Sequence, residues 1–141
     1  MFIKQLSVFV ENKPGRLEAI IDTLSAGNVN LRALSIADTT DFGILRIIAD
    51  DTAKAKDILK DIGVVSKESD VLAVSINDTA GGLAAILSPI TKAHVNIEYM
   101  YAFLGRAAGK ALMVIKTDDD VKAQSVLEGQ NADSLSESGI L

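Results

Sequence analysis

Apolar residues recur along the chain with two different periods, and each period predicts one kind of element. Between residues 3 and 10, apolar side chains alternate with more polar ones, which is typical of a strand with one face in a core. After a turn at residues 12–15, the spacing becomes i, i+3, i+4, i+7, which predicts an amphipathic helix. The apolar residues of this helix are Leu17, Ile20, Ile21 and Leu24. We expect Gly27 and Asn28 to end it, because both tolerate positive φ.

Two more strands and a second helix complete the unit. We expect the strands over 29–37 and 44–49, on either side of a polar turn. The second helix begins at the acidic residues 50–51, which suit the positive end of a helix dipole, and Gly63 ends it. A fourth strand begins at 64–66. The order is therefore strand, helix, strand, strand, helix, strand.

The same order occurs a second time. Sliding the chain by 66 positions places like residues on like residues, and the offset grows to 68 after the middle hairpin. The matched pairs include Leu6 with Leu72, Gly15 with Gly81, Ile20 with Ile86 and Asn30 with Asn96. This repeat predicts two tandem ferredoxin-like domains of the α+β class, residues 1–68 and 69–141. Each is a βαββαβ unit with an antiparallel sheet and both helices on one face.

The second copy has two irregular parts. Pro89 falls inside its first helix, where it forfeits a hydrogen bond to the carbonyl of Ala85 and should bend the helix. The polar segment 129–141 is expected to contain the final strand. Because each half is too small to bury much apolar surface alone, the two halves should pack together.

Composition narrows the function. With 48% hydrophobic and 23% charged residues the chain is globular, and no apolar run approaches the ~20 residues that span a bilayer. We therefore expect a cytoplasmic protein without a membrane or nucleic-acid partner, since the net charge is −5 and the basic residues are scattered. The chain has no cysteine and a single histidine, His94, which argues against thiolate chemistry, a zinc site or a catalytic triad. We expect no catalytic residue, cofactor or metal.

The first strand-to-helix turn, in the stretch ENKPGRL, has the composition of an anion site. Pro14 suits the first helical position, and Gly15 lets the main chain approach a ligand closely. The N–H groups of Gly15, Arg16 and Leu17 lie at the positive end of the helix dipole, which attracts a carboxylate. The alternative is that Asn12, Pro14 and Gly15 only begin a helix.

The longer stretch ENKPGRLEAIIDTLSAGNVNL resembles the ACT domain, a ferredoxin-like module that senses amino acids in metabolic regulators. In particular, its acid–Asn–basic–Pro–Gly–x–Leu run and its Val–Asn–aliphatic run are similar to the serine-binding regulatory domain of phosphoglycerate dehydrogenase. The second copy, NDTAGGLAAILSPITKAHVNI, fits less closely. Together the copies cover nearly the whole chain, so the resemblance implies a regulatory protein that is not an enzyme.

The resemblance also implies ligand-binding positions. They are Asn12, Pro14, Gly15, Arg16, Leu17 and Asn30 in the first copy, and Asp78, Gly81, Gly82, Leu83 and Asn96 in the second. The family binds ligands where two domains meet. We therefore expect crosswise pairs, Asn12 with Asn96 and Asp78 with Asn30, within the chain or across a homodimer. A side-chain amide both donates and accepts, so it can meet the carboxylate and the ammonium of an amino acid.

The chain departs from the serine-binding pattern, which has a histidine two residues before the motif asparagine. Val10 and Ile76 stand at those places. We therefore expect a small apolar or aromatic amino acid as the ligand, because an unpaired hydroxyl in an apolar pocket costs about 1–3 kcal/mol. Ala80 and Gly82 replace Pro14 and Arg16 in the second copy, so the second turn should be looser and the first site tighter.

Other polar and aromatic residues allow two interpretations. Tyr99 and Tyr101 either line a pocket or pack on the sheet. His94 either caps a helix end or contacts a ligand, and Arg16 either reaches a ligand carboxylate or points to solvent. The acidic runs at 50–51 and 118–120 are helix caps or a cation site, but they lack the spacing of a calcium loop.

Three functions remain open. The first is an amino-acid sensor that passes its signal to a metabolic enzyme or a transporter. The second is a structural regulatory subunit of an amino-acid-metabolism enzyme that binds no ligand. The third is a small ferredoxin-like enzyme of the acylphosphatase type, whose glycine-rich phosphate loop differs from ENKPGRL.

Overall fold

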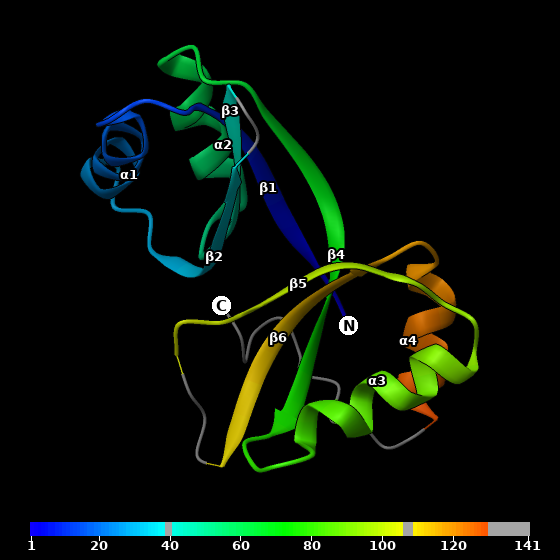
Figure 1. The fold of residues 1–141 in the computed structure, drawn as a ribbon. Coiled ribbons are helices and arrows are strands. Elements are labelled where there is room, and N and C mark those ends of the chain that lie inside the picture. Colours follow the sequence, from blue (N-terminus) through cyan, green and yellow to red (C-terminus); the bar gives the residue numbers. More distant parts are fainter. Residues whose placement is uncertain (39–40, 106–108, 130–141) are drawn as a thin grey trace. The chain divides into compact units, whose positions relative to one another are not determined.

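A computed structural model of the chain describes residues 1–38, 41–105 and 109–129 (Figure 1). The elements follow in the order β1 (Phe2–Glu11), α1 (Arg16–Ala26), β2 (Leu31–Asp38), β3 (Phe42–Ala49), α2 (Thr52–Asp61), β4 (Ser66–Asn77), α3 (Gly82–Lys92), β5 (Ile97–Ala102), β6 (Lys110–Thr117) and α4 (Asp120–Glu128). The expected α+β class with its repeated βαβ order is confirmed.

The described residues form two compact units. Residues 4–38 and 41–70 make up the first unit, and residues 1–3 with 71–105 and 109–129 make up the second. The strand order through the hydrogen-bonded ladders is β2-β3-β1-β4-β6-β5. The unit boundaries fall inside β1 and β4, so each unit contains a part of both strands. The boundary expected between residues 68 and 69 lies inside β4.

In the first unit both helices pack on one face of an antiparallel sheet. β1 pairs with β3 so that Leu6 lies opposite Ile47 and Glu11 opposite Phe42. Because side chains alternate along a strand, one set from each strand faces the helices. The resulting core consists of Leu6, Val8, Val10, Ile20, Leu24, Val29, Leu45, Ile47, Ala49, Ala55 and Leu59. Of the apolar residues expected on the first helix, Ile20 and Leu24 lie in this core, and Leu17 and Ile21 pack against it.

The second unit repeats the arrangement with β4, β6 and β5. β4 pairs with β6 so that Leu72 lies opposite Ile115 and Asn77 opposite Lys110. Beside β4, the N–H of Ala73 donates to the carbonyl of Met1 at 2.8 Å. The core of this unit consists of Leu72, Val74, Ile76, Ile86, Ile90, Val95, Ile115, Ala123 and Leu127.

One difference from the expected elements lies at the centre of the chain. The fourth strand of the first copy and the first strand of the second are a single strand, β4, of 12 residues. The polar stretch 67–70 lies near the beginning of this strand, with Lys67, Glu68 and Asp70 exposed. The final strand expected in 129–141 falls on residues that, after Gly129, lie outside the described part of the chain.

The helix ends follow the capping rules, with one correction. Asn28 and His94 end α1 and α3 with φ of 56° and 57°, which agrees with the capping interpretation of His94. Gly27 has φ of −79°, so Asn28 alone supplies the left-handed residue after α1. Asp51 and Asp119 cap α2 and α4 by accepting from backbone N–H groups.

The proline in the second copy does not interrupt its helix. α3 runs from Gly82 to Lys92 as one element with Pro89 inside it. The bend expected at Pro89 stays a prediction. None of the helices in the described ranges is long and apolar enough to cross a bilayer.

Candidate functional site

The turn between β1 and α1 is a type II β-turn, which corrects the expected position of Pro14. Gly15 has φ of 82° and ψ of −8°, and the N–H of Arg16 donates to the carbonyl of Lys13 at 3.3 Å. These are the values of a type II turn with proline at its second position and glycine at its third. Pro14 therefore lies in the turn, and α1 begins two residues later at Arg16.

The turn leaves the N-terminus of α1 partly open. The N–H of Arg16 is used within the turn, contrary to the expectation that it is free. The carbonyl of Gly15 accepts the first helical hydrogen bond, from Ala19 at 3.0 Å. No side chain caps this helix. The first turn of α1 can therefore still offer backbone donors to an anion.

A small cleft lies beside this turn. It has a volume of about 220 Å³ and is lined by Val10, Glu11, Asn12, Lys13, Leu17, Ile36 and Gly43. The side chain of Asn12 is exposed, and its backbone N–H donates to the carbonyl of Asp41 at 3.0 Å. The cleft thus combines a side-chain amide, one acidic and one basic side chain, and apolar walls. The sequence identified Asn12 and Leu17, but not the lining residues from the strands, because strand pairing is not visible in sequence.

The asparagine before β2 lies at the other end of this unit. The N–H of Asn30 donates to Asp50 at 3.1 Å, and the N–H of Asp50 returns a bond to the carbonyl of Asn30. The far end of β2 is the end near Asn12, since Gly43 pairs with Asp38 of β2 and with Val10 of β1. β2 is eight residues long, which corresponds to about 26 Å. One small ligand cannot touch Asn12 and Asn30 of the same unit.

The second copy repeats both features. Gly81 has φ of 85° and ψ of −8°, and the N–H of Gly82 donates to Thr79 at 3.0 Å, so this is again a type II turn. Asn96 precedes β5 and its N–H donates to Asp118 at 2.9 Å. Asp78 and Leu83 are exposed beside the turn.

The second turn leaves no room for a side chain at Gly82. A Cβ on Gly82 would lie 2.0 Å from the carbonyl oxygen of Asn77. Close packing therefore requires glycine at this position, and the looser second turn stays a prediction. That the first site binds its ligand more tightly than the second stays a prediction as well.

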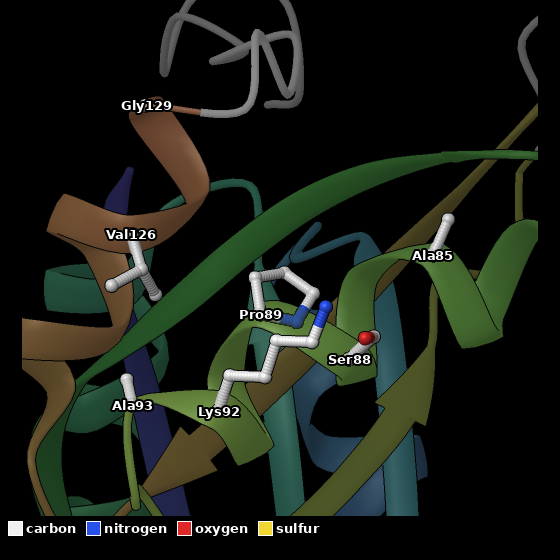
Figure 2. Close-up of a pocket in the computed structure, with 7 residues that line it drawn as sticks. All are labelled: Ala85, Ser88, Pro89, Lys92, Ala93, Val126 and Gly129. Carbon is white, nitrogen blue, oxygen red and sulfur yellow. The ribbon is translucent and has the colours of Figure 1, made fainter.

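A wider cavity of the second unit lies between α3 and the end of α4 (Figure 2). It has a volume of about 600 Å³ and is lined by Ala85, Ser88, Pro89, Lys92, Ala93, Val126 and Gly129. Figure 2 shows the side chain of Lys92 extended beside the ring of Pro89.

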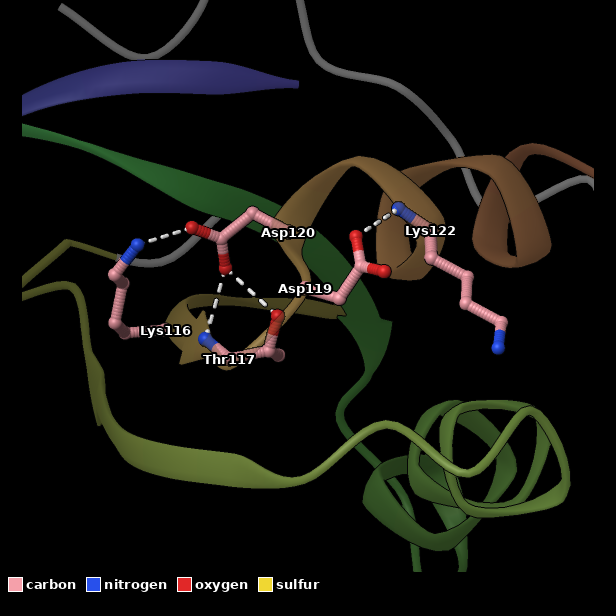
Figure 3. Close-up of polar contacts among 5 residues, drawn as sticks. All are labelled: Lys116, Thr117, Asp119, Asp120 and Lys122. Atoms are coloured by element: carbon pink, nitrogen blue, oxygen red, sulfur yellow. Dashed lines mark hydrogen bonds and ion pairs between the residues drawn. The ribbon is translucent and has the colours of Figure 1, made fainter.

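A polar cluster fixes the start of α4 (Figure 3). One oxygen of Asp120 accepts from the N–H and the hydroxyl of Thr117, both at 2.8 Å. The other oxygen pairs with the ammonium of Lys116. Burial alone would raise the pKa of Asp120, but these hydrogen bonds hold the pKa below its usual value. The hydrogen bond to Asp120 raises the pKa of Lys116.

The remaining candidates have structural roles. The rings of Tyr99 and Tyr101 stack with centroids 6.5 Å apart, and Tyr101 is buried, which favours packing. The acidic runs supply helix caps and backbone contacts. Nowhere in the described part of the chain do three or more metal-ligating side chains gather.

Comparison with known proteins adds a family and several structures. The family model of the ACT domain pair matches residues 1–140. The crystal structure of protein BT0572 from Bacteroides thetaiotaomicron is 39% identical, with a TM-score of 0.91, and the match covers 99% of this chain and 96% of that one. No curated protein sequence matches the chain.

Two structures of lower identity share the fold. The regulatory subunit of aspartate kinase from Thermus thermophilus is 14% identical, with a TM-score of 0.68 over 95% of this chain and 96% of that one. The corresponding subunit from Thermus flavus is 15% identical, with a TM-score of 0.61 over 92% and 94%.

Proposed function

The chain belongs to the ACT domain pair family, and from that premise we propose that it is a non-catalytic regulatory protein that binds an amino acid. The ligand is a small apolar or aromatic amino acid, and its binding modulates a metabolic enzyme or a transporter. The likeness of the first copy to the serine-binding domain of phosphoglycerate dehydrogenase stays a prediction.

The observation that carries this proposal is the uncapped N-terminus of α1 beside the Asn12 cleft. Backbone donors at a helix N-terminus suit a carboxylate. The amide oxygen of Asn12 and the carboxylate of Glu11 suit an ammonium group. Both charged groups of an amino acid thus find partners within one turn.

The position of Asn30 supports binding between two copies. Asn12 and Asn30 lie at opposite ends of the first unit, so a ligand that contacts both kinds of asparagine needs a second copy. We propose crosswise pairs, Asn12 with Asn96 and Asp78 with Asn30, formed within the chain or in a homodimer.

Titration calorimetry with single amino acids tests the crosswise pairs. We expect Asn12→Ala and Asn96→Ala each to weaken binding about tenfold, because each removes a hydrogen bond to a charged group. Ser88→Ala, an exposed substitution on α3 outside both turns, serves as the control and should bind normally. Unchanged affinity in Asn96→Ala would refute the crosswise arrangement.

A regulatory subunit without ligand binding is the alternative. It agrees with the fold shared with the Thermus aspartate kinase regulatory subunits. Co-elution with a partner enzyme whose activity no amino acid changes would favour this alternative over the sensor.

A further inference from the structure

A second cavity of the first unit lies along α1, separate from the Asn12 cleft. It has a volume of about 490 Å³, within the range of about 300–1,000 Å³ typical of small-molecule sites. Its wall consists of Phe9, Val10, Glu11, Arg16, Ala19, Ile20, Thr23, Phe42, Ile62, Gly63, Val64 and Val65. We call it the α1 groove. Val10 and Glu11 also line the Asn12 cleft, so the two cavities are neighbours.

The α1 groove contains apolar side chains that the fold leaves exposed. The exposed fractions are 48% for Phe9, 49% for Phe42, 47% for Ile62 and 66% for Val65. Single exposed apolar residues are ordinary, but a group of them around one concave surface indicates a binding site. A ligand that covers them removes this apolar area from water.

Charges of both signs lie at one end of the groove. One oxygen of Glu11 is 3.5 Å from Nε of Arg16 and 3.5 Å from Nζ of Lys13. These side chains are largely exposed, so they can exchange partners at little cost. A guanidinium beside a carboxylate complements the carboxylate and the ammonium of an amino acid.

The second copy lacks the aromatic and cationic side chains of the groove. Ser75, Lys110 and Gly82 take the places of Phe9, Phe42 and Arg16. The strand pairing supports this match, because Phe42 lies opposite Glu11 and Lys110 lies opposite Asn77. Among the described residues, the aromatic and charged parts of the groove thus belong to the first copy, although both copies share one backbone plan.

We propose that the α1 groove binds the side chain of a bulky apolar amino acid of the phenylalanine or leucine class. At the N-terminus of α1, the guanidinium of Arg16 adds to the backbone donors for the ligand carboxylate, and the ligand ammonium pairs with Glu11. Phe9, Phe42, Ile62 and Val65 cover the apolar side chain. This inference rests on the proposed sensor function and narrows its ligand from apolar or aromatic amino acids to those with a side chain that fills the groove.

Three features favour this occupant over a protein partner. The volume suits one small molecule, most of the lining residues are apolar, and the paired charges of Glu11 and Arg16 lie among them. A glycine or alanine ligand would leave the exposed aromatic rings uncovered. The groove therefore discriminates by the apolar area of the ligand.

Titration calorimetry with L-phenylalanine, L-leucine and glycine tests the proposal. We expect phenylalanine and leucine to bind at least about tenfold more tightly than glycine, since each buried CH₂ contributes about 0.8 kcal/mol. Phe9→Ser and Arg16→Gly place the residues of the second copy in the groove, and each should weaken phenylalanine binding about tenfold or more. Val121→Ser, which changes another exposed apolar residue, should leave binding unchanged.

The outcomes separate the groove from the sensor function. Phenylalanine binding that is lost in Asn12→Ala but unaffected in Phe9→Ser and Arg16→Gly overturns the groove and leaves the sensor. Binding of glycine but not of phenylalanine or leucine would also overturn the groove and leave the sensor function. Absence of binding by every amino acid overturns both. If light scattering instead shows that Phe9→Ser dissociates an oligomer, the groove is an interface between copies and the proposal is wrong. Since Phe9 is half exposed, circular dichroism should show Phe9→Ser folded.

Discussion

One glycine determines the backbone conformation of the turn at each of the two candidate sites. Gly15 and Gly81 provide the left-handed residue that a type II turn needs at its third position. The sequence indicates their role as backbone freedom, but the prediction that Pro14 is the first helical residue starts the helix two residues too early. Proline fixes its own φ and fits both positions, so composition alone does not decide between them.

The short distance between the Cβ position of Gly82 and the carbonyl oxygen of Asn77 predicts the effect of a substitution. Gly82→Ala places a Cβ 2.0 Å from the carbonyl oxygen of Asn77. We expect a loss of about 1–3 kcal/mol in the free energy of unfolding, since backbone must move to relieve the overlap. Urea denaturation measures this loss.

Gly105→Ala is the matched control for that experiment, because a Cβ at Gly105 meets nothing within 4 Å. It should change stability by less than about 0.5 kcal/mol. Equal stability of the Gly82→Ala and Gly105→Ala variants would contradict the tight packing of the second turn.

At the scale of elements, most of the fold could be predicted from the periods of the sequence. Apolar residues at helical spacing predict α1 and α2, and the sequence repeat predicts α3 and α4 at the matching positions. Gln5 is an exception: its position on the less apolar side of β1 suggests exposure, yet it is fully buried and its Nε2 donates to Ser7 at 3.2 Å. Burial on the second face of a strand depends on tertiary packing, which the alternation of one strand cannot reveal.

The single long strand β4 was missed for a similar reason. The domain boundary expected between residues 68 and 69 separates two strands, but the polar side chains around it are compatible with one continuous strand where they face solvent. The cavities were missed as well, because residues such as Phe9 and Phe42 meet only through the pairing of β1 with β3.

The cluster at the start of α4 makes stability depend on pH. The pKa of Asp120 is lower in the folded chain than the usual value of 3.8. Its contribution is therefore present above about pH 4 and is lost as the pH falls through the folded-state pKa. We expect Asp120→Asn to cost about 1–3 kcal/mol at pH 7, and the difference from the parent chain to shrink at lower pH.

Urea denaturation at a series of pH values between 7 and 2 measures this effect. Asp57→Asn, an exposed substitution on α2, controls for the loss of one negative charge. A constant difference between Asp120→Asn and the parent chain at every pH would show that the carboxylate of Asp120 does not titrate with a lowered pKa.

At the scale of the whole molecule, the repeat in sequence corresponds to two units built alike but equipped differently. Both have a type II turn and an asparagine before an outer strand; the sequence indicates the glycines and the asparagines, but not the turn type or the strand order. The first unit alone, among the described residues, adds the α1 groove and the Glu11–Arg16 pair. We expect this difference to decide which ligand the first unit selects.

The central claim, amino-acid binding, is tested most directly by thermal unfolding of the purified protein with each common amino acid up to millimolar concentration. A ligand that binds only the folded state adds RT ln(1 + [L]/Kd), about 2.7 kcal/mol at a hundredfold excess over Kd. We predict a raised unfolding temperature with one or a few related apolar amino acids, and a reduced shift in Asn12→Ala. An unfolding temperature that no amino acid changes would contradict the sensor function.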